Sequence, residues 1–402
     1  MLVYILGVVL FALGICVSVA LHEAGHMVAA KSFGMKVRRY FVGFGPTVFS
    51  FRRGETEYGL KWLPLGGFCD IAGMTALDEV TPDEAPRAMW RFKTWKRTVV
   101  LAAGSFTHFV FGFIVLYLMA VTMGLPNLAA KPVINTVSDC VRSATTAEEW
   151  NDPTCRPGDP APAKSAGLRP GDEVTAIDGT PVETWPELLS AVQSSSGPTE
   201  FRILRDGEPL TLTVDVPRVE RPDGEGGTER VGAIGASQAG MLTYGPVEAI
   251  GGSAAFTGDL LVMTWERLLE FPEKIPAVIE AILGEERDPE TPVSVVGASR
   301  IGGEAVEHGL WEVFFLLLAS LNFFVGIFNL LPLLPLDGGH IAVTWYERVR
   351  DWIRKLRGKA AGGPVDYTKL NAVTTVFVLI GGAIVLLTVT ADIVNPIRLV
   401  PQ

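Results

Sequence analysis

Four long uncharged stretches limit what this chain can fold into. Each is long enough to cross a ~30 Å hydrocarbon layer as a helix: Val3–Leu21, Thr98–Leu125, Val313–Leu336 and Leu370–Ala391. The first has no Lys or Arg ahead of it and no small-residue cleavage pattern after it, so we interpret it as a retained helix and not as a signal peptide. The sequence therefore predicts an α-helical polytopic membrane protein with four transmembrane helices.

The charges between these stretches predict how the chain is oriented. Residues 31–97 contain twelve Lys or Arg, residues 338–369 contain seven, and residues 131–311 contain fourteen against thirty Asp or Glu. Short basic loops stay in the cytoplasm, whereas long segments translocate largely regardless of charge. We therefore expect a cell-membrane protein with both termini and residues 131–311 outside. The acidic pI, near 5.2, comes mainly from that outer segment and argues against a nucleic-acid partner.

Three ionisable residues end the first apolar stretch, in the sequence LHEAGH. On a helix, His22 and His26 lie one turn apart on one face, so both imidazoles can bind the same metal ion. Glu23 stands beside them, where a carboxylate can accept a proton from water activated by the ion. The alternative is two core histidines that happen to lie four residues apart. That alternative leaves unexplained why costly polar groups end a membrane span.

A third metal ligand is expected from the topology. The third stretch ends NFFVGIFNLLPLLPLDGGH, which would place Asp337 at the cytoplasmic end of its helix, at the depth where His22 and His26 lie. A carboxylate at that depth is costly unless it is paired, and a metal ion would satisfy it. Alternatively, Asp337-Gly338-Gly339 is only a turn that closes the helix. His340 is a competing ligand that we expect at the cytoplasmic rim.

The outer segment has the pattern of a small α+β domain followed by surface helices. Residues 165–193 predict a turn, a short strand and an amphipathic helix, and residues 200–216 alternate around Asp206-Gly207, a strong hairpin signal. We expect a domain at 131–218 and a linker with amphipathic membrane-surface helices at 219–311. In that linker, 218–232 is expected to be a flexible loop and 246–271 an amphipathic helix on the outer leaflet. The first two membrane helices occupy 1–130 and the last two 312–402.

Two of the four cysteines lie in the outer segment. Cys140 and Cys155 flank the stretch VRSATTAEEWNDPT, and an oxidising compartment would allow a disulfide between them. Two unpaired thiols are the alternative.

Taken together, HEAGH, NLLPLLPLDGG and the intervening domain resemble the site-2 protease family of intramembrane zinc metalloproteases. The resemblance covers nearly the whole chain, and SVVGASRIGGEA at 294–305 with the outer cysteines is similar to its actinobacterial members. It implies one catalytic zinc ion held by His22, His26 and Asp337, with Glu23 as the catalytic base. It also implies that the outer domain is PDZ-like, binding a substrate terminus or excluding substrates by size.

The resemblance extends to candidate substrate-binding residues. Asn329 and Pro332 match the family motif N-x-x-P-x-x-x-x-D-G, in which the Asn is implied to hold substrate backbone. Residues 43–74 are similar to a membrane-associated β-hairpin, in which Gly66 and Gly67 would allow close backbone approach. An ordinary cytoplasmic hairpin is the alternative.

The chain departs from the family motif G-P-x-x-N at GSFTHF. There His108 stands near the Asn position, either as a helix-packing hydrogen-bond donor or as a polar group near the site. On the third span, Gly326 is expected to allow close helix packing, while the role of Asn322 stays open.

The resemblance implies single-span membrane proteins as substrates, with anti-sigma factors already cut on the outer side as the expected class. Two other functions compete: a membrane zinc transporter, and a catalytically silent PDZ scaffold. A transporter usually has several intramembrane acids along a path, and here there is one cluster. The sequence gives no oligomeric state.

Overall fold

The computed structural model describes residues 1–75, 78–144, 146, 149, 154–222, 227–363 and 365–399. The chain forms two compact units. One, the membrane unit, consists of Met1–Val121 and Gly245–Gln402, and the other, the inserted unit, is Thr122–Tyr244.

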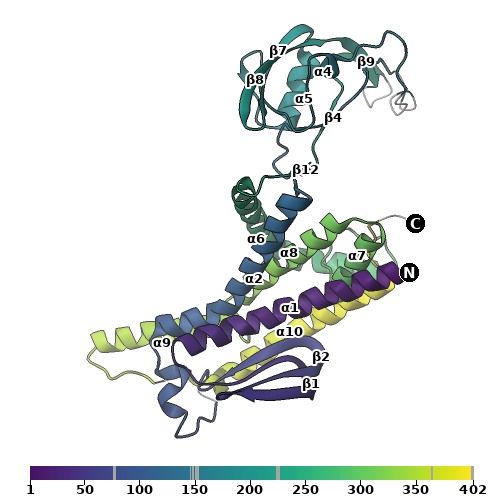
Figure 1. The fold of residues 1–402 in the computed structure, drawn as a ribbon. Helices are drawn as coiled ribbons and strands as arrows, with labels where there is room; N and C mark the ends of the chain where they lie inside the picture. Colours follow the sequence, from purple (N-terminus) through teal and green to yellow (C-terminus); the bar gives the residue numbers. More distant parts are fainter. Residues whose placement is uncertain are drawn as a thin grey trace. The chain divides into compact units, whose positions relative to one another are not determined.

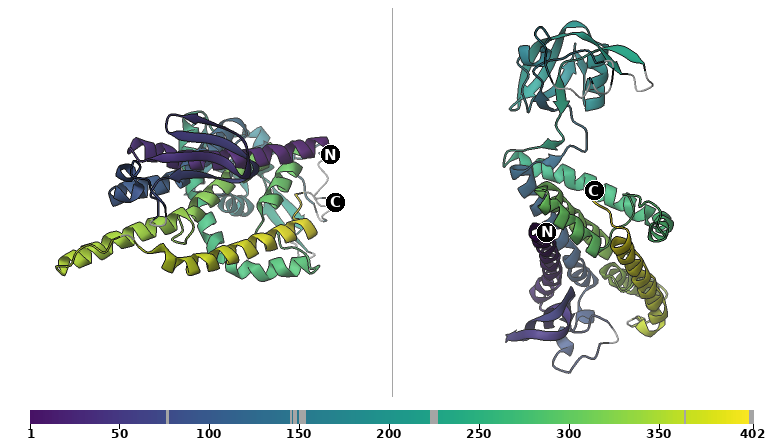
Figure 2. Two further views of the ribbon diagram at one scale, coloured as in Figure 1. Left: turned by 90° about the horizontal axis from the view of Figure 1, so that it is seen from below. Right: turned by 90° about the vertical axis from the view of Figure 1, so that its right-hand side faces the viewer.

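Long helices dominate the membrane unit (Figures 1 and 2). They are α1 (Leu2–Ser32), α2 (Thr94–Thr122), α6 (Glu248–Ile282), α7 (Val295–Glu307), α8 (Trp311–Asn329), α9 (Asp337–Leu356) and α10 (Tyr367–Val394). Among the described residues, α1, α2, α8 and the Leu370–Val394 part of α10 are long and apolar enough to cross a bilayer. This confirms the predicted polytopic membrane protein.

Glycines let α7 pack closely on α1. A Cβ atom on Gly7 would lie 2.8 Å from the Val306 side chain, and one on Gly302 would lie 2.7 Å from the Phe11 ring. Phe11 also packs edge-on against Phe314 of α8, with ring centroids 5.4 Å apart. These contacts form a buried cluster that fixes α1, α7 and α8 to one another.

A buried ion pair ties α10 to the segment between α6 and α7. Arg287 Nη2 lies 2.7 Å from Asp392 Oδ1, and the other Asp392 oxygen accepts a hydrogen bond from the Ser294 backbone N–H. Nη2 of Arg287 also donates to the Pro292 carbonyl oxygen, while Nε donates to Thr291 Oγ1 and Nη1 to the Asn395 carbonyl oxygen. Because its partners satisfy it, this charged pair can be buried at the end of a membrane helix.

The predicted third span is shorter than the uncharged stretch that suggested it. Its helix α8 ends at Asn329, and an irregular segment precedes α9, which begins at Asp337. The physical reason is proline, since Pro332 and Pro335 disfavour helical backbone at the residues before them. Asp337 is therefore the first residue of a new helix, and neither the end of the third span nor part of a closing turn.

The sheet after α1 is more elaborate than a simple hairpin. Strands β1 (Val37–Arg53) and β2 (Thr56–Ile71) each bend back, so that residues 37–42 pair with 67–71 on one side and residues 39–42 pair with 57–60 on the other. Residues 49–53 then pair with 56–60 and form the far edge. This sheet lies beside α1 (Figures 1 and 2), and Tyr40 donates a hydrogen bond to the Ala20 carbonyl of that helix.

The inserted unit is built of short elements. Its strands are β3 (Leu125–Pro126), β4 (Ile134–Val137), β5 (Glu173–Ile177), β6 (Thr180–Pro181), β7 (Gly197–Arg205), β8 (Glu208–Val216), β9 (Arg218–Pro222), β10 (Thr228–Gly232), β11 (Ala236–Gln238) and β12 (Met241–Leu242). Its helices are α4 (Pro162–Ser165) and α5 (Trp185–Ser194). The unit extends beyond the predicted 131–218 at both ends.

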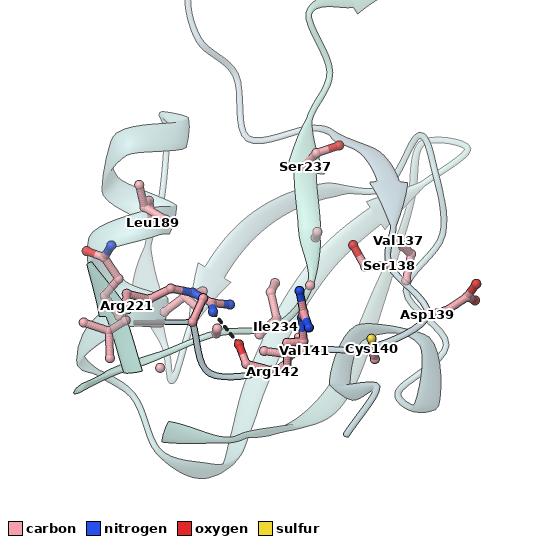
Figure 3. Close-up of a pocket in the computed structure, with 18 of the residues that line it drawn as sticks. Val137, Ser138, Asp139, Cys140, Val141, Arg142, Leu189, Arg221, Ile234 and Ser237 are labelled. Carbon is pink, nitrogen blue, oxygen red and sulfur yellow. Dashed lines mark hydrogen bonds between the residues drawn. The ribbon is translucent and has the colours of Figure 1, made fainter. Parts of the chain in front are cut away.

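A disulfide and a cavity lie on one side of α5. Cys140 and Cys155 are bonded, with Cα atoms 5.8 Å apart, so the structure contains the predicted bridge and not the two unpaired thiols. Residues around Cys140, the segment 231–237 and α5 enclose a cavity of about 590 Å³ (Figure 3). Val141, Leu189 and Ile234 contribute apolar surface to its lining.

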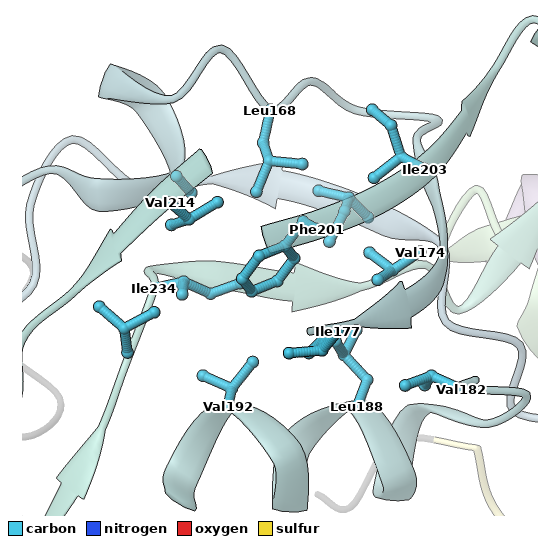
Figure 4. Close-up of a cluster of buried hydrophobic side chains, with 13 residues drawn as sticks. Leu168, Val174, Ile177, Val182, Leu188, Val192, Phe201, Ile203, Val214 and Ile234 are labelled. Carbon is cyan, nitrogen blue, oxygen red and sulfur yellow. The ribbon is translucent and has the colours of Figure 1, made fainter. Parts of the chain in front are cut away.

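The core of the inserted unit lies between α5 and a sheet with the strand order β6-β5-β7-β8 (Figure 4). Phe201 and Leu188 are among its most completely buried side chains. Strands β7 and β8 pair around Asp206 and Gly207, which both have positive φ, as a two-residue hairpin turn requires. The predicted strand, helix and hairpin are confirmed here.

One prediction about the linker was wrong, and the other was right about the helix but not about its length. Most of the expected loop 218–232 forms the β9–β10 hairpin, in which Val219 pairs with Val231 and is buried. Its alternation of apolar and charged residues was a strand signal that the central Gly-rich sequence obscured. The helix expected at 246–271 is the first part of the longer α6, which continues through Pro272 and Pro276.

Candidate metal centre

Two histidines of α1 face each other within the membrane unit. His22 and His26 are only 9% and 7% exposed, and their Nε2 atoms lie 3.0 Å apart. Their spacing of four residues on a helix produces this arrangement, as predicted.

Asp337 completes the cluster from the start of α9. Its Oδ2 atom lies 3.3 Å from the Nε2 atoms of both His22 and His26. Burial alone would raise the pKa of this carboxyl group, but the two imidazoles more than offset that effect and the pKa of Asp337 is lowered. An ionised carboxylate therefore faces both rings.

The hydrogen bonds of the histidines indicate a metal ion. His26 Nδ1 lies 2.8 Å from the Val100 carbonyl oxygen, which only accepts, so Nδ1 carries the proton and Nε2 of the neutral ring has a lone pair. Within the described residues, His22 Nδ1 is buried without a hydrogen-bond partner. Two imidazole nitrogens and a carboxylate oxygen, all within 4.8 Å of one another, are a donor set that suits zinc. The residues present fit this ion.

Glycines bring α2 close to the cluster. A Cβ atom on Gly104 would lie 2.4 Å from His26 Nε2 and 2.6 Å from His22 Cε1. On the facing helix, a Cβ atom on Gly25 would lie 2.5 Å from the Ala103 carbonyl oxygen. Gly104 therefore leaves room for both imidazoles, a role that the sequence analysis missed. A glycine at the centre of an apolar span was the signal that could have identified it.

The side chain of Glu23, on α1, is half-buried against the sheet. A Cβ atom on Gly67 would lie 2.9 Å from Glu23 Cγ, and the backbone N–H of Cys69 lies within reach of the Glu23 carboxyl group. Gly66 has a φ of +142°, which few other residues adopt. Gly67 thus allows β2 to approach α1 at the residue next to His22, whereas Gly66 leaves room for the Phe44 ring within the sheet.

A second polar pair lies behind the cluster. His108 Nδ1 is 2.8 Å from Asn322 Oδ1, and Asn322 Nδ2 donates to the Leu318 carbonyl oxygen at 2.8 Å. The His108 ring centroid is 5.0 Å from that of His22. His108 is therefore both a helix-packing hydrogen-bond donor and a polar group beside the cluster. Gly326 packs against the Phe109 ring, as expected for a packing residue.

The remaining candidate residues, Asn329, Pro332 and His340, lie within eight residues of Asp337 in the sequence. Asn329 is half-buried at the last turn of α8, and Pro332 is exposed in the segment that leads to Asp337. His340, expected at the cytoplasmic rim, is partly buried, and its ring stacks on Tyr367 with Nδ1 3.3 Å from the hydroxyl oxygen.

The fold and the site together define a class. The His-His-Asp cluster is built from α1, which is able to span a bilayer, and from α9. The carboxylate of Glu23 stands next to it, so that the residues of α1 have the order HExxH. This combination is that of a membrane metalloprotease.

Comparison with known proteins agrees with this class. The family model "Peptidase family M50" matches residues 10–372. "Zinc metalloprotease Rip1" of Mycobacterium bovis is 48% identical over 407 residues, which cover 99% of this chain and 100% of the relative. The protein of the same name from Mycolicibacterium smegmatis is 49% identical over 98% of both chains, and "Metalloprotease MmpA" of Caulobacter vibrioides is 27% identical over 88% of this chain and 89% of its own.

The chain belongs to peptidase family M50. It is a zinc metalloprotease of the site-2 type, embedded in the membrane through several spans.

Proposed function

We propose that this protease hydrolyses peptide bonds within the transmembrane segments of single-span membrane proteins. His22, His26 and Asp337 hold the single zinc ion, and Glu23 is the catalytic base. The observation that carries the proposal is the convergence of the two Nε2 atoms and Asp337 Oδ2, each nitrogen 3.3 Å from that oxygen. Glu23 follows His22 directly in the sequence.

The protein's own groups account for the proton transfers. When bound, zinc supplies Lewis-acid chemistry, which polarises a carbonyl group and makes water more acidic. Glu23 accepts a proton from the attacking water and then donates it to the amine that leaves. Val100 holds the His26 ring through Nδ1, which keeps Nε2 free for the ion. The hydrocarbon around α1 and α2 limits the access of water to the site.

The substrate must present an extended backbone, because a helix hides its carbonyl groups in its own hydrogen bonds. We infer that the edge strand at residues 67–71 pairs with the unwound substrate, a recognition mode that other sheets use for peptides. Its position beside Glu23 supports this, since Gly67 permits the close approach to α1 and Gly66 the positive φ that precedes it. Asn329 and Pro332, in the motif before Asp337, complete the substrate-binding residues.

The inserted unit is proposed to be a PDZ-like domain on the outer side, with both termini also outside and the active site near the cytoplasm. Its cavity beside α5 (Figure 3) has room for an extended peptide. It would bind the terminus of a substrate or exclude substrates whose outer parts are intact. Anti-sigma factors already cut on the outer side, in regulated intramembrane proteolysis, are the proposed substrate class.

The test is Glu23→Gln in the full-length protein, with a single-span membrane protein as co-expressed substrate. We expect zinc to remain bound while cleavage falls at least 100-fold, the scale of a lost general base. Glu79→Gln, which changes an exposed glutamate of the same unit, is the matched control and should cleave normally.

Cleavage by Glu23→Gln at the normal rate would eliminate Glu23 as the base. A zinc transporter would keep its metal flux in this variant, and a PDZ scaffold would keep its binding of partners. The single variant Glu23→Gln therefore distinguishes the three functions.

A further inference from the structure

Helix α9 carries an apolar face that the described protein leaves uncovered. Trp345, Val349, Trp352 and Leu356 recur at spacings of three and four residues, so they lie on one side of the helix. All four are exposed, Trp352 to 58% and Leu356 to 68%. Unlike the spanning helices, α9 is apolar on one side only.

Basic residues border this apolar face on both sides. Seven-residue spacing places Arg348 and Lys355 along one border, and Arg350 and Arg357 along the other. Arg348, Lys355 and Arg357 are exposed, and among the described residues none of them contacts a carboxylate.

The acids in the second half of α9 are paired with groups of the protein itself. Glu347 Oε2 lies 2.9 Å from Arg97 Nη1 of α2, and its other oxygen accepts a hydrogen bond from the Val365 N–H. Asp351 binds Arg350 and the Gly362 N–H. The outward charge of α9 is therefore positive, although the helix contains both signs.

Helix α6 offers a contrast within the same unit. It also exposes apolar side chains, including Trp265 and Leu269, but it has six Asp or Glu against two Lys or Arg. A helix that faces a leaflet of negative headgroups needs the pattern of α9: tryptophan and aliphatic residues toward the acyl chains, and Lys or Arg at both borders. The charge pattern of α6 does not fit such a leaflet.

We propose that α9 lies flat on the membrane surface and binds anionic lipid headgroups through Arg348, Lys355 and Arg357. The helix begins at Asp337, so its attachment to the lipid fixes the depth of that carboxylate beside His22 and His26. The lipid surface is then a structural partner of the metal centre, in addition to being the solvent of the spanning helices.

The experiment measures the depth of α9 in vesicles. A nitroxide label is placed at Val349→Cys in the full-length protein, with Cys16 and Cys69 replaced by Ala. The protein is reconstituted in phosphatidylcholine with or without phosphatidylglycerol. In the mixed vesicles, we expect the label to collide with oxygen more than with a water-soluble nickel complex. A label at Lys359→Cys, in the exposed segment after α9, should show the reverse and serves as the reference for water.

Neutralising Arg348, Lys355 and Arg357 to Gln should release the helix. Each basic residue near an anionic surface contributes about a fivefold preference, so three together change the ratio of bound to free helix roughly 100-fold. Lys131→Gln, Arg169→Gln and Arg202→Gln, three exposed residues of the inserted unit, make the same change in net charge and should leave the label in the lipid.

Three results would overturn the proposal. A label at 349 that is open to the nickel complex in mixed vesicles would show that α9 does not lie on lipid, and one shielded from both reagents would show that protein covers the face. A label that stays in the lipid without phosphatidylglycerol and in the Gln variant would remove the role of charge. The measurement needs no cleavage, so it stands apart from the proposed function.

Discussion

Gly104 determines how closely α2 can approach the two histidines. The α-hydrogen side of this residue faces both imidazoles, and any side chain would occupy their space. We predict that Gly104→Ala displaces His22 and His26, and that the purified protein contains less than a tenth of the zinc of the unmodified protein, measured by atomic absorption. Gly381→Ala in α10 adds the same methyl group in open space and should keep its zinc. Equal zinc in the two variants would contradict the contact at Gly104.

Asn322 and His108 stabilise the packing of α8 on α2. Asn322→Leu leaves the buried Nδ1–H of His108 without an acceptor, which costs about 1–3 kcal/mol in the free energy of unfolding. The double variant His108→Leu with Asn322→Leu removes both polar groups, so we expect it to be less destabilised than Asn322→Leu alone. Thermal or denaturant unfolding in detergent measures both. If the destabilisation of the double variant equals the sum of those of His108→Leu and Asn322→Leu, the pair is not coupled.

The sequence was informative at single residues where chemistry and spacing coincide. His22, Glu23 and His26 stand out because three polar groups end an apolar stretch, and Asp337 follows from the depth that four spans imply. The pairing of His108 with Asn322 could not be predicted, because it depends on the rotation and relative height of two helices, which the apolar composition of both spans leaves open.

At the scale of elements, the sheet and α1 meet at Gly67. Gly67→Ala would press a methyl group against Glu23 Cγ, so we predict that cleavage of a single-span substrate falls by at least tenfold while zinc content is unchanged. Gly251→Ala, at an open position of α6, is the control. Loss of zinc together with cleavage would mean that the substitution disturbs α1 as a whole and not the position of Glu23.

The elements also show where sequence patterns misled. An uncharged run defined the third span to Leu336, but two prolines end the helix early and start α9 at the aspartate. In the inserted unit, the Gly-rich centre of 218–232 suggested a loop, although the flanking residues alternate as in paired strands. In both cases the composition predicted whether the segment is apolar or polar. The prolines and the strand pairing determined which helix or strand it forms.

At the scale of the whole molecule, the membrane unit and the inserted unit have separate cores. The disulfide between Cys140 and Cys155 lies within the inserted unit, and a bridge of this loop length contributes about 3 kcal/mol by restricting the unfolded chain. We predict that replacing both cysteines by Ser lowers the unfolding temperature of the inserted unit, followed by circular dichroism of the isolated fragment 122–244. Zinc content of the full-length variant should not change, and its loss would show that the two units are coupled.

The His-His-Asp cluster joins the first helix to a segment near the end of the chain. A ribosome that has made only α1 and α2 has therefore produced two histidines and a glutamate without the carboxylate that completes the set. If these three residues hold the zinc ion as proposed, the nascent protein cannot complete the site until α8 has been inserted and α9 has begun. Under the proposed ligand assignment, proteolytic competence therefore arrives late in biosynthesis.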